Sequence, residues 1–248
     1  LNLNFYPETS NINSWTGGLF DVYLNDTDGT RIYHQLGPNL QVNYATTSFG
    51  IRYTDYAEIL RPKDFAGIVT NTRYDYENWQ IDFSNSTSQK ATVSANYRQG
   101  RTLNLVPAPG SLPYVADTSR IDLSFFWRPI DRLQVRNTYF LTELQNRNSD
   151  TKIFTNEIFR SNWNYQFTKE WSLRFIAQYD KTDAGPATRL TDDENLNFDL
   201  LLRYVINPWS AFYIGFNTNQ SNFDIVEIEG ERELVVANDL RQDGDQVF

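Results

Sequence analysis

The chain lacks cysteine and methionine altogether and has a single histidine among its 248 residues. The absence of cysteine excludes disulfides, thiolate metal sites and cysteine nucleophiles together. One histidine without cysteine leaves too few soft ligands for a transition-metal site. We therefore expect no resident cofactor.

Long apolar runs and an excess of positive charge are absent as well. No apolar segment approaches the ~18 residues that a membrane-spanning helix requires. The formal net charge is -9, whereas a nucleic-acid-binding protein needs a basic face for phosphates. These absences exclude a helical membrane protein and argue against nucleic acid as a partner.

Aromatic residues, by contrast, are abundant, with 6 Trp, 15 Tyr and 17 Phe. From Trp171 to Tyr179 apolar residues alternate with polar ones, so each kind occupies one face of a strand. Such a strand suits a soluble sandwich with a buried apolar face. It also suits a membrane barrel with lipid outside and a polar lumen inside. Periodicity alone leaves both folds open.

The links between strands distinguish the two folds. Period-two segments between turn signals predict about twelve strands and no helix. Short links are expected at 45–48, near 85–90, and at 128–131, 168–170 and 207–210, alternating with longer ones at 25–39, 55–67, 101–119, 143–151, 180–195 and about 224–245. This alternation is a rule of membrane barrels, with turns at one rim and long loops at the other, and not of sandwiches.

We therefore predict an all-β, antiparallel, up-and-down transmembrane β-barrel in the bacterial outer membrane. Residues 1–248 form one barrel domain, and further strands are expected before Leu1 and after Phe248. Outer-membrane lipid and lipopolysaccharide are the expected partners, together with other outer-membrane or periplasmic proteins.

The tryptophans favour the same fold. Each lies at or near a predicted short link, where indole rings suit a membrane interface. The alternative is that they anchor hairpins of a soluble protein. The predicted aromatic girdle is Trp15, Trp79, Trp127, Trp163, Trp171 and Trp209.

Arginine recurs on the polar faces of successive strands. A charge that faces lipid near the bilayer centre costs ~2–4 kcal/mol, so these residues are expected to face the lumen or to sit at a rim. They either guide anionic or sugar solutes or pair across strands to fill the lumen. The lumen-facing set is Arg52, Arg73, Arg98, Arg136, Arg160, Arg174 and Arg203, with Asp180 and Asp199.

Three loop features allow further hypotheses. His34 shares a predicted loop with Asp26 and Asp28, as an outer-membrane hydrolase would require, although an exposed loop histidine is the simpler interpretation. The acidic stretches 191–195 and 224–245 either carry solvated charge or bind Ca²⁺ or Mg²⁺ weakly. The proline-containing loop 104–115 either folds inward as a constriction, contacts a partner, or extends over the surface, held stiff by proline.

The last third of the chain resembles a known family. Gln178 and Tyr179 end one strand, Leu200–Leu202 lie in the next, and Asn207 and Pro208 form a turn before an aromatic strand. This pattern is similar to the carboxy-terminal outer-membrane barrel of bacterial proteins that carry an upstream carbohydrate-binding module of the family-nine type. The family then has Gln-Val-Phe, as at Gln246, Val247 and Phe248.

The resemblance implies an outer-membrane barrel, a sugar-binding module upstream and no catalytic residues. The expected function is a pore or membrane-embedded scaffold, with saccharide-like solutes suggested by the resemblance alone. The alternatives are a plugged structural barrel that anchors an upstream domain or joins a larger complex, and, least favoured, a hydrolase.

Overall fold

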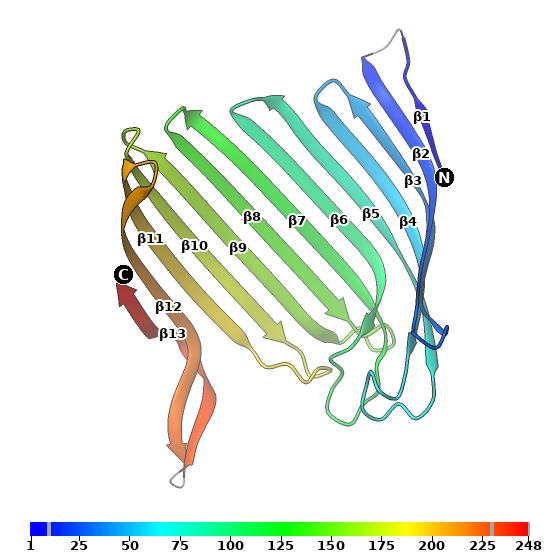
Figure 1. Ribbon diagram of the computed structural model, residues 1–248. Helices are drawn as coiled ribbons and strands as arrows, with labels where there is room; N and C mark the ends of the chain where they lie inside the picture. The colour runs from blue at the N-terminus through cyan, green and yellow to red at the C-terminus, as the bar shows by residue number, and fades with distance from the viewer. Residues whose placement is uncertain (9–10, 229–230, 248) are drawn as a thin grey trace.

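The computed structural model describes residues 1–8, 11–228 and 231–247; within these ranges, the side chains at 224–228, 231–234, 238, 243 and 247 are left out. Thirteen strands form a single antiparallel sheet in which each strand pairs with the next along the chain (Figure 1). No helix capable of spanning a membrane occurs in the described residues. The predicted all-β, antiparallel, up-and-down fold is confirmed, and β1 and β13 form the two edges of an open sheet.

The strands are β1 (Asn2–Phe5), β2 (Ile12–Asn25), β3 (Arg31–Tyr44), β4 (Thr47–Leu60), β5 (Thr72–Ser88), β6 (Ala91–Asn104), β7 (Tyr114–Ile130), β8 (Leu133–Gln145), β9 (Lys152–Gln166), β10 (Trp171–Ala184), β11 (Asp193–Asn207), β12 (Ser210–Ile228) and β13 (Glu231–Val247).

Short turns and longer loops alternate between the strands. The turns lie along one rim of the sheet and the loops along the other (Figure 1). The turns are 45–46, 89–90, 131–132, 167–170 and 208–209, and the loops are 26–30, 61–71, 105–113, 146–151 and 185–192. We call these edges the turn rim and the loop rim.

Two predicted loops are strand instead. Of the acidic stretch 224–245, residues 224–228 belong to β12 and 231–245 to β13, and register places Glu227 opposite Arg232. The expected loop 25–39 is reduced to a turn, since the amide of Gly29 donates to the carbonyl of Asp26 (2.9 Å) and Gly29 adopts a φ of 84°. β3 therefore begins early.

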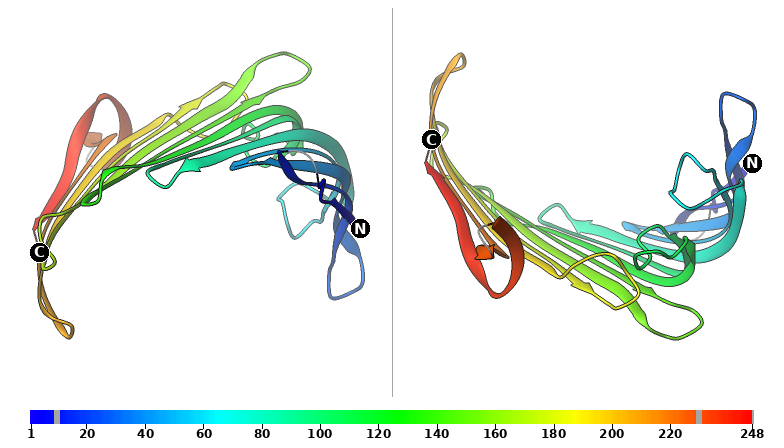
Figure 2. Two further views of the ribbon diagram at one scale, coloured as in Figure 1. Left: turned by 90° about the horizontal axis from the view of Figure 1, so that it is seen from above. Right: turned by 90° about the horizontal axis from the view of Figure 1, so that it is seen from below.

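The sheet bends into a trough with a convex and a concave face (Figure 2). Side chains on the inside of a bend crowd together and are shielded. On β7 Leu123 and Phe125 are 43% and 41% exposed, whereas Asp122 and Ser124, which point the other way, are partly buried. The apolar residues are thus on the convex face, and the polar residues are on the concave face.

Apart from Val135 on β8, the buried apolar residues of the described chain gather near the loop rim instead of between two layers. Loop residue Ile68 packs with Leu60, Tyr76 and Leu103, and a second cluster contains Ala116, Leu144 and Ile153. Both clusters form where the long loops fold against the strand ends.

Candidate functional site

Register places most of the predicted charged residues on the concave face. Arg52 and Arg98 lie opposite Gln80 from either side, and Arg203 lies between Ser172 and Tyr213. The concave set is Arg52, Arg98, Arg136, Arg160, Arg174, Arg203, Asp180 and Asp199.

Arg73 is the exception, and its predicted lumen position is wrong. β5 pairs with β4 without a bulge, so Arg73 shares the convex face with Trp79. Its guanidinium lies 2.7 Å from the carboxylate of Asp75, and both side chains are exposed. Arg73 is the second residue of β5 and therefore lies near the loop rim, the other position that the sequence allowed for an arginine.

Five of the six tryptophans lie near the turn rim: Trp15, Trp127, Trp163, Trp171 and Trp209. Trp79 does not, because β5 continues from it as far as Ser88 before the turn. Its ring instead contacts that of Tyr53 at 4.8 Å on the convex face. The expected single girdle is therefore incorrect for Trp79.

Tyrosines mark the other boundary of the apolar band, a feature that sequence reasoning missed. Register aligns Tyr139 and Tyr179 in one row of residues that crosses the strands on the convex face. Tyr97 lies in the next row towards the loop rim. Its row leads across the sheet to Glu157 and Lys181, where the convex face becomes charged. Their position relative to the tryptophans is visible only when the register is known.

Concave-face charges are only partly paired. Arg120 binds Asp122 at 2.8 Å and Arg174 binds Asp199 at 3.3 Å. Arg160 forms no ion pair within the described residues. Pairing therefore neutralises some of the arginines and leaves others available to a solute.

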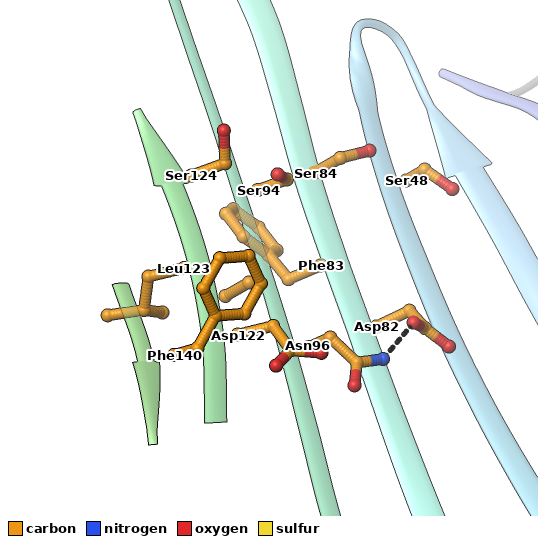
Figure 3. A pocket seen from close by; sticks show the side chains of 11 residues that line it. Ser48, Asp82, Phe83, Ser84, Ser94, Asn96, Asp122, Leu123, Ser124 and Phe140 are labelled. Carbon is orange, nitrogen blue, oxygen red and sulfur yellow. Dashed lines mark hydrogen bonds between the residues drawn. The ribbon is translucent and has the colours of Figure 1, made fainter. Parts of the chain in front are cut away.

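A row of small hydroxyl residues crosses the concave face and leaves a hollow. Register aligns Ser48, Ser84, Ser94 and Ser124 on four adjacent strands. Figure 3 shows this serine hollow, which is lined further along the strands by Asp82, Asn96, Asp122 and Phe140. The serines lie far apart in the sequence, so the sequence gives no sign of the row.

The chemistry of the serine hollow suits a polyhydroxylated solute. The amide of Asn96 donates to the carboxylate of Asp82 at 2.5 Å, and Gln80 donates to the same carboxylate at 3.0 Å. Hydroxyl and carboxylate oxygens can accept hydrogen bonds from a solute, and the ring of Phe140 supplies an apolar surface beside them. No nucleophile and base are held together here.

Three loops fold over the concave face at the loop rim, and we call them the loop cap: 61–71, 105–113 and 185–192. The hydroxyl of Thr188 donates to the carbonyl of Val106 at 2.6 Å, and Arg189 donates to that of Leu105 at 3.2 Å. The Arg189 guanidinium also lies 5.8 Å from the centre of the Phe65 ring. The proline-containing loop is therefore held against loop 185–192.

A carboxylate clamp attaches the cap to the 26–30 turn. Asp26 accepts from Lys63 (2.8 Å) and from Arg61, while Asp64 accepts from Arg61 Nε at 2.7 Å. The Lys63 hydrogen bond and the Thr27 amide lower the pKa of Asp26 to about 2. The side chain and amide of Arg61 likewise lower the pKa of Asp64 to about 2.

The residues of the hydrolase hypothesis are not brought together. His34 lies on β3, not in a loop, and its Nε2 is 2.7 Å from Asp21 on the convex face. Asp26 is held in the clamp and Asp28 accepts from the Thr30 amide. Within the described residues, no group of three or more His, Asp or Glu could hold a metal ion, and the acidic side chains at 224–234 lie outside them.

No family model matches the sequence, and no curated protein matches it. Among solved structures, the chain is similar to OmpT, an outer membrane protein of Vibrio cholerae folded in vitro. The trimer form has a TM-score of 0.41 and 12% identity, covering 99% of this chain and 93% of that chain. A Pseudomonas aeruginosa FadL homologue has a TM-score of 0.38 and 12% identity, covering 99% and 73%.

Proposed function

We propose that this chain forms the wall of a bacterial outer-membrane β-barrel whose concave face borders a solute pathway. The observation that carries the proposal is that each strand places apolar side chains on the convex face and charged or polar side chains on the concave face. On β10, the convex face is apolar from Trp171 to Tyr179, whereas Arg174 is on the concave face. A membrane strand needs ~9–11 residues, which this segment supplies.

The exposed convex face supports a lipid environment. Large apolar side chains on neighbouring strands are half exposed, as Phe125 (41%) and Phe159 (44%) illustrate. A continuous apolar surface of this kind is unfavourable in water and marks a membrane or protein contact. Outer-membrane lipid and lipopolysaccharide are therefore the proposed surroundings of this face.

The serine hollow supports a saccharide-like solute, in agreement with the family resemblance. Its hydroxyls, its carboxylates and the phenyl ring of Phe140 combine hydrogen-bonding groups with a flat apolar surface. Because the hollow lies on the wall of the proposed lumen, it would act as a subsite that a solute occupies during passage.

Planar-bilayer recording tests the pathway and the solute separately. Purified protein should insert from detergent and give stable current steps, which maltose oligosaccharides reduce in a concentration-dependent way. Phe140→Ala should weaken this block several-fold, while Phe125→Ala, the same truncation on the convex face, should leave it unchanged. A protein that is monomeric and soluble without detergent would refute the membrane assignment, and an inserted but silent protein would refute the pore.

The loop cap favours a second candidate function, a plugged barrel that serves as a scaffold. Loops 105–113 and 185–192 cross the concave face and are joined by a backbone bridge between Pro107 and Thr188. If they close the lumen, the wild type should insert without conducting, and deletion of residues 107–111 should produce current. Current through the wild type would contradict this candidate.

A further inference from the structure

A second hollow on the concave face lies beside the turn rim and gathers three arginines. Arg132 belongs to the β7–β8 turn, Arg174 to β10 and Arg203 to β11. Strand pairing brings Arg132 and Arg203 to the same part of the sheet. The backbone amide of Gln166 donates to the carbonyl of Arg132 at 2.8 Å. Gln166 and Arg203 in turn lie on either side of Ser172 in register. We call this feature the arginine hollow.

The positive charge of the arginine hollow is not balanced by the protein. Of the three guanidiniums, that of Arg174 has a carboxylate partner, Asp199, at 3.3 Å. Arg132 and Arg203 form no ion pair with any described residue. Asp131 is the one acidic residue in the lining, so together with Asp199 two carboxylates stand against three guanidiniums.

The remaining lining supplies neutral hydrogen-bonding groups and one aromatic phenol. Gln134, Asn164, Gln166 and Ser172 surround the arginines, and the Tyr213 side chain lies opposite Arg203 in register. Guanidinium groups bind the oxygens of phosphate, sulfate and carboxylate in forked geometry, and amides and hydroxyls complete such a site. The three arginine side chains are exposed, so an anion from solution can reach them.

We propose that the arginine hollow binds an oxyanion group, such as phosphate, sulfate or carboxylate, carried by a water-soluble solute. Its position on the concave face distinguishes it from a lipid-headgroup site, which would lie on the convex face. The proposal rests on the proposed lumen and adds a substrate property to it: the preferred solutes carry a negative charge that is held at the turn rim.

Isothermal titration of the detergent-solubilised protein with inorganic phosphate tests the site without requiring a conducting pore. The wild type should show saturable binding. Arg203→Gln should weaken it about tenfold, or ~1.4 kcal/mol, because it removes one charge-assisted donor group from the site. Arg160→Gln is the matched control, since it removes the same charge from the concave face outside the hollow, and it should leave the affinity within about twofold.

Arg203→Lys controls for misfolding of the Gln variant, because lysine keeps the positive charge and lacks only the forked hydrogen-bond donors of the guanidinium. It should bind phosphate with intermediate affinity and retain the electrophoretic mobility of the folded protein. Absence of saturable binding by the wild type, or equal loss in the Arg160 and Arg203 variants, would overturn the proposal. Phosphate binding by a protein that carries no current would refute the pore and retain the site.

Discussion

The two faces of the sheet have the same backbone and opposite chemistry. On β7, Phe125 and Trp127 cover the convex face, while Ser124 and Asp122 lie on the concave face one residue away. Concave residues bind one another across strands, as Asn96 and Asp82 do, whereas the convex rings remain exposed. The difference teaches that the position of a residue in the alternation of a strand determines which face it occupies. Two neighbouring residues should therefore respond in opposite ways when each is replaced by a charged residue.

Placing a charge on each face is the strongest way to break this comparison. Phe125→Arg sets a guanidinium on the convex face near the middle of the apolar band and should cost ~2–4 kcal/mol of folding free energy in a bilayer. Ser124→Arg, the adjacent residue on the concave face, should be nearly neutral. The fraction folded in lipid vesicles, measured by heat-modifiable electrophoretic mobility, reports both. Equal loss in the two variants would contradict the assignment of faces.

The loop cap tests whether the concave face is open at the loop rim. The double variant Thr188→Val with Arg189→Ala removes the side-chain hydrogen bonds to Val106 and Leu105, each worth ~0.5–1.5 kcal/mol. We expect the cap to loosen and the single-channel current to rise measurably, by less than deletion of residues 107–111 would cause.

Asn148→Ala is the control for the cap, because it changes a loop that is not part of it. Its current should equal that of the wild type. If the double variant also matches the wild type, the cap does not restrict the pathway, and its role is confined to covering the buried clusters at the strand ends.

The fold was predictable because alternation is a local property. Trp171 to Tyr179 alternate within one strand, and proline or glycine occurs in loops 26–30, 61–71, 105–113 and 185–192, so strand type and meander order follow from the chain. The short β2–β3 link at 26–30 was predicted as a longer loop over 25–39. Its closure depends on the local hydrogen bond between Asp26 and Gly29, and β3 can then begin before Tyr33 and His34.

The site was less predictable because it depends on register between strands. Arg73 was assigned to the lumen, although it is six residues from Trp79 on β5 and therefore shares the face of Trp79 wherever the strand has no bulge. The serine row and the arginine hollow likewise join residues from three or more strands. Neither has a spacing that a single sequence could reveal.

The smallest expected effect concerns the carboxylate clamp. Acid should loosen the loop rim, where the clamp lies, and leave the turn rim unchanged. The pKa of Asp26 and of Asp64 is about 2 in the folded chain, below the ordinary value of 3.8. A lowered pKa contributes stability above the ordinary value and loses it as pH falls towards 2. Hydrogen exchange of residues 61–71, corrected for intrinsic rates, should therefore accelerate between pH 4 and 2.

Asp26→Asn should accelerate exchange of the same loop at pH 7 by a few-fold, and its difference from the wild type should shrink as pH approaches 2. Asp150→Asn is the matched control in the 146–151 loop and should have no effect on residues 61–71. The turns at the opposite rim should keep their exchange rates in both variants, because the clamp is local and exposed charges are screened within ~10 Å. An equal change at both rims would mean that acid loosens the whole sheet instead of the clamp.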